Sequence, residues 1–429
     1  MATDGWRRGL GLLALIIAGE AIFGLPFHVA RYFRPTLLAG LGLSNGELGA
    51  VFSAYGVLAL LCYLPGGLLA DRYSPRRLLV VALVSTALGG AYLLTMPGFA
   101  ELVVVFAGFG VTTVLLFWAA LIRAVRAWGD AAGQGRAFGL LDGGRGLFSA
   151  GLATLAWYAL AAGFTGDPAL ASPGERLVAL RGVFVVYIAA TLLAAALVWL
   201  LVPDEVGARA QRGDAASVRR VLGSSALWLH ALVVLCAYCG FKSIDDFSLF
   251  AVEAHGLDEV EGARVNVLAA WLRPVAALGA GLLADRLWPT RVAQLCFGVL
   301  IVSHAALAFG EPGAEGLWLF WIGVAATVAA AFGLRGVYFA ILQELRVPAA
   351  LTGTAVGFVS LVGFTPDVFL GPITGWLLDR SPGAAGHQDV FVLFTLVSAL
   401  GLVASLVLGA RATAARARSR GASHPGSCA

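Results

Sequence analysis

The chain has 429 residues, of which 59% are hydrophobic and 13% charged, and its formal net charge at pH 7 is +4. Because a soluble domain of this length carries about twice that charged fraction, the composition excludes a soluble globular protein. Apolar runs long enough to cross the ~30 Å hydrocarbon layer as helices recur throughout, and no alternating strand pattern is present. The sequence therefore predicts an all-α polytopic membrane protein.

Twelve transmembrane spans are predicted along the chain. Breaker and cap signals separate them: Ser44-Asn45-Gly46 precedes the second span and Pro348 precedes the eleventh. The spans are 10–33, 45–70, 78–97, 102–127, 135–162, 182–202, 224–250, 262–284, 292–310, 316–345, 352–378 and 390–410.

The two longest polar interruptions are a loop at 163–181 and a linker at 203–223. The linker divides the spans six and six. We therefore expect four regions, namely an N-terminal six-helix bundle (1–202), the linker (203–223), a C-terminal six-helix bundle (224–410) and a basic tail (411–429).

Basic residues predict the orientation in the membrane. If both termini are cytoplasmic, 19 of the 29 Lys and Arg residues fall on cytoplasmic segments. Acidic residues dominate outer loops such as 251–261. The positive-inside rule therefore places both ends in the cytoplasm, and the Arg-rich tail lies near anionic lipid.

A motif is repeated at half the chain length. Residues 67–77 read GLLADRYSPRR and residues 281–291 read GLLADRLWPTR, an offset of 214. A weaker echo joins GRAFG at 135–139 to GTAVG at 353–357. The chain is therefore predicted to be two homologous halves. A shorter look-alike, GWLLDR at 375–380, is at the opposite helix end and is not counted as a third copy.

The duplicated G-x-L-x-D-R-x-x-x-x-R between helices two and three resembles the signature of the major facilitator superfamily. Twelve spans, a split after the sixth and internal termini match the same family over essentially the whole chain. The resemblance implies a secondary transporter in which two bundles rock about a central cavity. The repeated motif would then act as a gating latch, whose residues are Gly67, Asp71, Arg72, Arg77, Gly281, Asp285, Arg286 and Arg291.

The fifth span departs from one branch of the family. Drug and proton antiporters carry a Gly-Pro-rich signature there, whereas residues 139–151 read GLLDGGRGLFSAG, without proline and with Asp142 and Arg145 inserted. This departure argues against a multidrug exporter.

Charged residues within the spans avoid the third, sixth, ninth and twelfth, the four that face lipid in this family's fold. Each buried charge costs roughly 2.5–3.5 kcal/mol at mid-bilayer on insertion scales. Their confinement to the other helices predicts that they face an interior. They are either paired structural ions or a substrate site with a proton relay.

The sole lysine, Lys242, lies in the seventh span with Asp245 and Asp246 at i+3 and i+4, which predicts an ion pair on one helix face. The 214 offset places Lys242 opposite His28 and Asp245 opposite Arg31, beside the potential helix breaker Pro26. Polar groups at matched depth on broken first and seventh helices are typical of a substrate site. A basic residue on each of these helices resembles the branch of the family that moves organophosphates and sugar acids.

Lys and Arg are the natural ligands for phosphate, sulfonate or carboxylate groups. The candidate substrate-binding residues are Lys242, Arg31, Arg273, Arg335, His28 and Arg145. The candidate proton-coupling residues are Asp245, Asp246, Glu20 and Asp367. The alternative for the central group is a helix-internal ion pair that only neutralises Lys242.

These observations predict a proton-coupled carrier of a small organic anion, in the inner membrane of a bacterium and monomeric. No cofactor, metal or nucleic acid is expected; the expected partners are the solute, a coupling ion and membrane lipid. One alternative keeps the fold but carries a neutral sugar or nucleoside, with the buried charges serving coupling and gating. A transporter-like sensor or membrane enzyme is a further alternative, although no catalytic Cys-His, Ser-His-Asp or H-E-x-x-H set is present.

Overall fold

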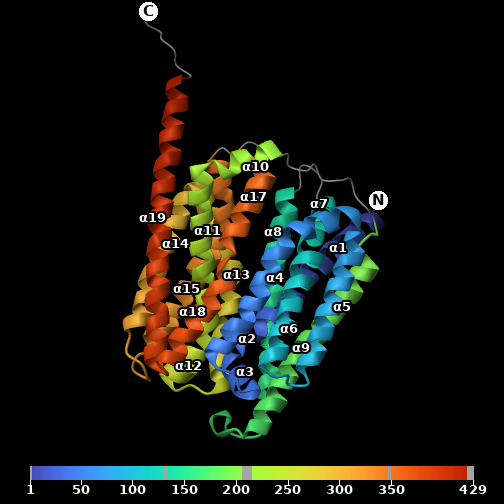
Figure 1. The fold of residues 1–429 in the computed structure, drawn as a ribbon, viewed down its shortest axis with the longest axis vertical. Coiled ribbons are helices and arrows are strands. Elements are labelled where there is room, and N and C mark those ends of the chain that lie inside the picture. Colours follow the sequence, from blue (N-terminus) through green and yellow to red (C-terminus); the bar gives the residue numbers. More distant parts are fainter. Residues whose placement is uncertain (1, 129–133, 205–214, 346, 348, 423–429) are drawn as a thin grey trace, which may run out of the picture.

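The computed structural model describes residues 2–128, 134–204, 215–345, 347 and 349–422, and these residues form helices and turns without a strand. The predicted all-α class is confirmed. Part of the predicted linker, 205–214, and the end of the predicted tail, 423–429, lie outside the described residues. The helices form two groups that stand side by side, one from each half of the chain (Figure 1).

The first group contains two π-helical segments, η1 and η2, and one 3₁₀ turn, η3. Its elements in chain order are α1 (Ala2–Ala21), η1 (Gly24–His28), α2 (Val29–Tyr32), α3 (Arg34–Leu41), α4 (Asn45–Arg72), α5 (Pro75–Leu93), α6 (Phe99–Gly110), η2 (Val111–Trp118), α7 (Ala119–Trp128), α8 (Gln134–Ala161), η3 (Pro168–Leu170) and α9 (Pro173–Leu201).

The second group is interrupted twice by 3₁₀ turns, η4 and η5. Its elements are α10 (Ala215–Leu222), α11 (Ser225–Lys242), η4 (Ser243–Asp246), α12 (Phe247–His255), α13 (Glu259–Arg286), α14 (Pro289–Phe309), α15 (Leu317–Val337), η5 (Tyr338–Ala340), α16 (Ile341–Glu344), α17 (Ala349–Gly363), α18 (Pro366–Arg380) and α19 (Ala384–Ala422).

Eleven segments within the described residues are long and apolar enough to cross a membrane. The remaining predicted span corresponds to α8, which is 28 residues long but contains several glycines together with Asp142 and Arg145. At 1.5 Å per residue, α8 has about the length of the bilayer. Length therefore makes α8 the twelfth spanning helix, and its polarity suits an interior position.

The sixth predicted span begins nine residues earlier than expected. α9 starts at Pro173, because Ser172 and Glu175 form a reciprocal capping box in which each side chain accepts from the other residue's backbone N–H. The predicted loop at 163–181 is correspondingly shorter. The S-x-x-E spacing was present in the sequence and marks this helix start.

The first and seventh spans are both broken. Pro26 has no N–H to donate, and the chain widens into η1 before α2 begins. In the seventh span, α11 ends at Lys242 and η4 tightens the chain before α12. At both breaks, η1 and η4, the backbone departs from regular α-helix.

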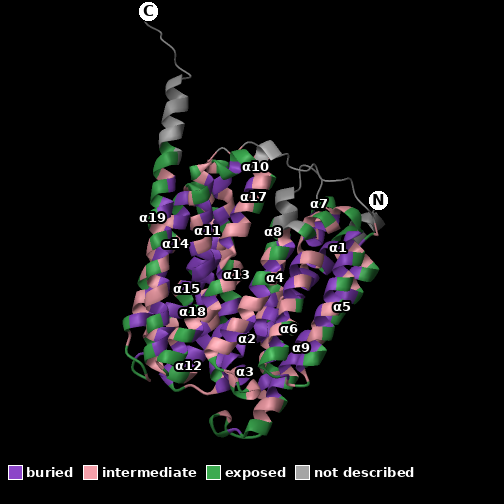
Figure 2. Ribbon diagram, in the orientation of Figure 1, coloured by how far each residue is buried: buried purple, intermediate pink, exposed green. Residues whose placement is uncertain are grey.

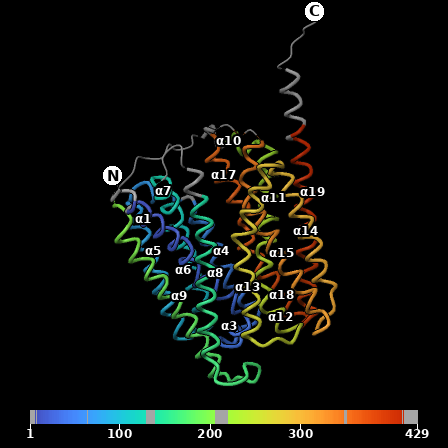
Figure 3. Tube along the Cα trace, turned by 180° about the vertical axis from the view of Figure 1, so that it is seen from behind, coloured from blue at the N-terminus to red at the C-terminus, as the bar shows by residue number. Residues whose placement is uncertain are grey.

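The helices of the two groups meet at one end of the molecule, at α3 and α12, and diverge toward the end that carries both termini (Figures 1 and 3). We name these the far end and the termini end. At the far end, a Cβ on Gly49 of α4 would lie 2.3 Å from the carbonyl oxygen of Gly371 of α18. At the termini end, a Cβ on Gly67, Gly281 or Gly357 would have no neighbouring heavy atom within 4 Å. The far end is therefore closed and the termini end open.

Exposed residues lie along the outer faces of the helices, and buried residues lie in the interior of each group (Figure 2). Many of the exposed residues are large and apolar. On the helices that were predicted to face lipid, Leu88 of α5, Leu192 of α9, Val302 of α14 and Leu396 of α19 are all exposed. In water such a surface would be unfavourable. In a bilayer it is the expected outer surface.

Candidate substrate site

A cavity of about 150 Å³ lies between the two groups of helices and is lined by both. Nine of its lining residues are aromatic, four are arginines, two are carboxylates and one is histidine. Seven of the predicted site residues contribute to this wall: Glu20, His28, Arg31, Arg145, Arg273, Arg335 and Asp367. The structure therefore brings together residues that are up to 347 positions apart in the sequence.

Glu20 of α1 is held by two arginines and a histidine. Arg145 Nε of α8 lies 3.0 Å from Glu20 Oε2, and Arg273 Nη1 of α13 lies 2.6 Å from Glu20 Oε1. His28 Nε2 approaches Oε1 to 3.4 Å. Since Glu20 is only 2% exposed, its charge would be very costly without these partners. The contact with Arg273 joins the two halves of the protein.

Lys242 and Asp245 form the ion pair that their spacing predicts, with Lys242 Nζ 2.6 Å from Asp245 Oδ2. The other carboxylate oxygen of Asp245 accepts from Arg31 Nε of α2 at 2.5 Å. Arg31 and Asp245 are 214 residues apart, which is the offset of the sequence repeat. Equivalent positions of the two halves therefore meet directly.

The backbone of Arg31 also joins the two halves. Its carbonyl oxygen accepts from Ser248 Oγ of α12 at 3.1 Å and from Asn266 Nδ2 of α13 at 2.5 Å. This carbonyl is available because α2 ends one residue later, at Tyr32. The broken first helix thus provides a side-chain contact and a main-chain contact from one residue.

Asp246 does not share the face of Lys242, contrary to the expectation from i+4 spacing. Residues 243–246 form a 3₁₀ turn, which has about three residues per turn, so Asp245 at i+3 stacks on Lys242 while Asp246 is rotated away. Asp246 instead approaches Arg34 Nη1 at 3.4 Å and His387 Nδ1 at 2.7 Å. It lines a smaller cavity of about 40 Å³ together with Lys242 and Asp245.

Asp367 lies at the break between α17 and α18. Its two carboxylate oxygens accept from Tyr238 Oη at 3.0 and 2.9 Å, and Lys242 Nζ lies 3.8 Å away. The sequence suggested this break from Pro366. It contained no signal for the Tyr238 contact.

Arg335 of α15 differs from the other cations of the cavity. Its guanidinium lies 4.3 Å from the ring centre of Phe241, whose ring is also 4.4 Å from the guanidinium of Arg31. Among the described residues, no carboxylate lies within 4 Å of the Arg335 guanidinium. Arg335 therefore gives the cavity a positive charge, and no carboxylate among the described residues neutralises this charge by direct contact.

Aromatic rings complete the surroundings of the lysine. Lys242 Nζ lies 5.1 Å from the ring centre of Phe27 and 5.0 Å from that of Phe52. Such contacts stabilise a cation by about 0.5–2 kcal/mol. Phe27 follows Pro26 directly in the sequence, but its role depends on the π-helical turn, which the sequence did not specify.

The repeated gating motif lies at the open termini end. Asp285, Arg286 and Arg291 are exposed, as is Arg72, and Asp71 is half-buried. No ion pair joins the two copies among the residues that the structure describes. Arg77 instead contacts Asp204, at the start of the linker, at 2.9 Å.

The whole chain resembles known membrane proteins. A model of the Major Facilitator Superfamily matches residues 14–366. The inner membrane protein YqcE of Escherichia coli K12 is 26% identical over 416 residues, covering 94% of each chain. The inner membrane protein YihN of the same strain is 26% identical over 411 residues, covering 92% of this chain and 93% of that one.

Solved structures show the same fold. A bacterial homolog of the human lysosomal transporter Spinster, in an inward-facing and unoccupied conformation, has a TM-score of 0.72 at 16% identity and covers 94% of this chain and 98% of its own. The nucleoside transporter NupG has a TM-score of 0.68 at 14% identity and covers 95% and 99%. The family match extends over most of the chain, the helices adopt the same fold, and the chain belongs to the Major Facilitator Superfamily.

Proposed function

We propose that this protein carries a small organic anion across the cytoplasmic membrane of a bacterium by alternating access, coupled to protons. The observation that carries the proposal is Arg335, a guanidinium in the central cavity without a carboxylate partner among the described residues. A positive charge kept unpaired in a desolvated site is costly unless an anion binds to it. A sugar acid, sulfonate, carboxylate or phosphate ester would supply that anion.

The charges of the cavity support the same conclusion. Its wall contains the arginines at 31, 145, 273 and 335 but only the carboxylates Glu20 and Asp367. Lys242 and Asp245 do not line this cavity but the smaller one, and as an ion pair they add one charge of each sign. The excess is positive, and arginine binds planar anions in a bidentate manner.

Proton coupling would use the carboxylates that now balance these cations. Asp245 bridges Lys242 and Arg31, so protonation of Asp245 would release both cations to an incoming anion. Glu20 stands in the same relation to Arg145 and Arg273. The anion and the proton are then transported together, because the binding of each makes the free energy of binding of the other more favourable.

Alternating access would move residues 1–202 against residues 224–410, with 203–223 as the connection. If the positive-inside rule sets the orientation, the open termini end faces the cytoplasm and the structure is an inward-facing state. The exposed gating motifs fit this assignment. Asp71 and Asp285 would form their contacts only when the termini end closes.

A thermal-stability screen of the purified protein tests the substrate class. Sugar acids, sulfonates, carboxylates and phosphate esters are compared with neutral sugars and nucleosides at two pH values. A solute present at 100 times its Kd stabilises the folded state by about 2.7 kcal/mol. We expect an anionic solute to stabilise the wild type and Arg335→Lys, but not Arg335→Gln.

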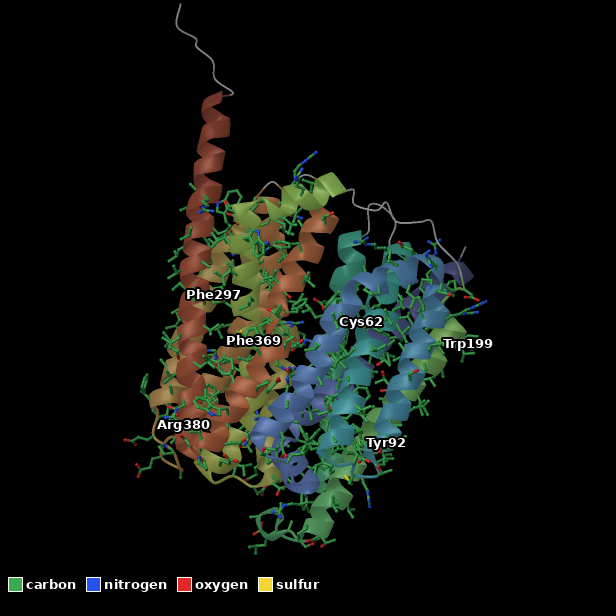
Figure 4. The ribbon with its side chains drawn as sticks, viewed as in Figure 1. Cys62, Tyr92, Trp199, Phe297, Phe369 and Arg380 are labelled. Carbon is green, nitrogen blue, oxygen red and sulfur yellow. The ribbon has the colours of Figure 1, made fainter. Side chains whose placement is uncertain are left out.

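Arg380→Gln is the matched control. Arg380 also stacks on an aromatic ring, with its guanidinium 5.2 Å from the ring centre of Trp376, but it is exposed at the far end of α18 (Figure 4). This variant should respond to the anion as the wild type does. Stabilisation that persists in Arg335→Gln would contradict the proposal.

A neutral sugar or nucleoside is the second candidate, favoured by the nine aromatic residues of the cavity wall, because sugars and bases stack on such rings. The nucleoside transporter NupG shares the fold. In that case neutral solutes alone would stabilise the protein, and Arg335→Gln would leave their effect unchanged.

A further inference from the structure

A buried histidine at the closed far end has a carboxylate on each side of its ring. His387 lies in the first turn of α19, and its side chain is fully buried. Its Nδ1 is 2.7 Å from Asp246 Oδ2, and its Nε2 is 3.1 Å from Glu253 Oε2 of α12. Both ring nitrogens are therefore in hydrogen-bond contact with acceptors.

This geometry requires a proton beyond those of a neutral histidine and two carboxylates. A neutral imidazole has one N–H and can donate to only one of the two oxygens. The second contact forms when the ring is doubly protonated or when one carboxyl group carries the proton. In either case the three side chains together hold one proton more than a neutral imidazole and two carboxylates do.

The group is linked to the closure of the far end through Asp246. Its Oδ1 lies 3.4 Å from Arg34 Nη1 of α3, which belongs to the other half of the protein. Arg34 also donates to Asn45 Oδ1 at 2.8 Å within its own half. When the halves separate at this end, Arg34 moves away with its half.

The charges change when Arg34 leaves. With Arg34 in place, two carboxylates, one imidazolium and one guanidinium sum to zero. Without Arg34, the remaining three groups sum to −1. A buried net negative charge raises the affinity of the group for a proton. A proton that binds the open state more tightly than the closed state favours the open state.

Other charged groups surround the cluster. Lys242, Asp245 and Asp367 line the cavity of about 40 Å³ with Arg34 and Asp246, and that volume is large enough for water. On the opposite side, the ring of Phe250 separates His387 from His255, which bonds to the carbonyl of Gly313. Asp389, two residues along α19, is exposed.

The two ends of the cluster differ in access to water. The side chain of Glu253 is 34% exposed, whereas those of His387 and Asp246 are 0% and 5% exposed. A proton can therefore enter at Glu253 while the far end is closed. From Asp246 the small cavity leads to the ion pair of Lys242 and Asp245.

We propose that Glu253, His387 and Asp246 form a proton-binding site at the far end, separate from the central cavity, whose proton occupancy rises when Arg34 leaves and the far end opens. Protons from the far side would thus favour opening toward that side. The proposal rests on the proposed function only in taking the proton as the coupling ion, and its tests need no substrate.

The first test detects the proton. Nitrogen NMR of the purified full chain, labelled at its six histidines, distinguishes neutral from doubly protonated rings, and His387→Gln assigns the signal. Infrared spectroscopy detects a protonated carboxyl group, which Glu253→Gln or Asp246→Asn would remove. One of these two signals is expected at neutral pH. A neutral His387 ring without a protonated carboxyl group would overturn the proposal.

The second test measures opening with a spin-label pair. The labels are placed at the exposed positions Ala39 on α3 and Ala385 on α19, with the native cysteines replaced by alanine. Acidification should increase the population with the longer distance, by up to about tenfold per pH unit for one proton. His387→Gln should lose this pH dependence.

His230→Gln is the control, because His230 is also fully buried in the same half but bonds only to the carbonyl of Tyr338. It should keep the pH dependence of the wild type. If His387→Gln does not fold, Glu253→Gln provides the same comparison from a more exposed position. An unchanged pH dependence in the folded variant would contradict the proposal. If no anion stabilises the protein in the thermal screen, the spectroscopic test and the pH dependence of the label distance still test this proposal.

Discussion

Glu20 shows how one buried carboxylate can join the two halves of the protein. Its carboxylate lies between two arginines from opposite halves, Arg145 at 3.0 Å and Arg273 at 2.6 Å. This is the geometry in which arginines bind a free carboxylate or phosphate. Glu20 thus compensates the charge of both arginines.

We expect Glu20→Gln to lower the thermal stability substantially, by about 3 kcal/mol, because two buried guanidinium groups lose their counter-charge. Sulfate or phosphate should restore stability to this variant more than it affects the wild type. Melting temperatures with and without each anion measure the effect. Asp142→Asn is the control, since Asp142 also faces Arg145, at 3.5 Å, but is 73% exposed. Equal responses of the two variants would contradict the assignment.

Individual contacts were predictable to different degrees. The pair of Lys242 and Asp245 followed from helical spacing, and the proximity of Arg31 to Asp245 followed from the 214-residue repeat. The partners of Glu20 did not follow, because Arg145 and Arg273 are 125 and 253 residues away without a repeat relation. His387 was missed because its predicted span began three residues later.

At the scale of the element, the closure of the far end depends on the packing of α4 against α18. Gly49 and Gly371 approach so closely that a Cβ on Gly49 has no room. Asp379, in the GWLLDR segment at the end of α18, accepts from the backbone N–H groups of Asn45 at 3.0 Å and Gly46 at 2.7 Å. These N–H groups begin α4 and have no partner within the helix.

Asp379→Asn should weaken the closed far end. A carboxylate at a helix N-terminus contributes about 1 kcal/mol, which corresponds to roughly a fivefold change in a two-state population. The distance between labels at Ala39 and Ala385 reports the change. Asp389→Asn is a suitable comparison, because Asp389 is exposed near the same end. A distance distribution like that of the wild type would show that the contact of Asp379 with the start of α4 does not stabilise the closed far end.

Gly49→Ala should hinder closure more strongly. The added methyl group would stand 2.3 Å from the carbonyl oxygen of Gly371, so α4 and α18 must separate. The same label pair should show a longer mean distance at every pH. Gly108→Ala on α6, where nothing lies within 4 Å of the added atom, should leave the distance unchanged.

Helix positions were more predictable than helix breaks. Apolar length and caps located most spans to within a few residues. The exceptions are the starts of α1 and α9, which lie eight and nine residues earlier than predicted, and both ends of α19, which begins six residues earlier and ends twelve residues later. The π-helical segments at 24–28 and 111–118 could not be located, because they depend on how neighbouring helices pack around a widened turn. The break before Pro366 was an exception, since proline disfavours helix in the preceding residue.

At the scale of the whole molecule, the positions of the basic residues and the open end make one prediction together. Both termini should be cytoplasmic, so a fluorescent protein fused after residue 422 should fluoresce, whereas alkaline phosphatase fused there should be inactive. Phosphatase inserted in the loop between α8 and α9, at the far end, should be active. The reverse pattern would make the structure an outward-facing state and reverse the direction of the proposed proton entry.

The apolar spans and the repeat predicted an all-α membrane protein of two six-helix halves. The resemblance of the repeated motif to the major facilitator superfamily supplied the arrangement of those halves. The end at which the halves meet was not predictable. Both states of an alternating-access protein are formed by one sequence, and their difference in free energy is the sum of many small contacts.

The carbonyl oxygen of Arg31, which accepts from Ser248 and Asn266, also affects how this protein can diverge. Any amino acid at position 31 retains that carbonyl, so the main-chain part of the closure does not depend on which side chain is present. Substitution at this position could then alter the charge offered to a solute while the halves still join. If Arg31 contacts the solute as proposed, a lineage of such transporters can change its cargo while the main-chain part of the closure is retained.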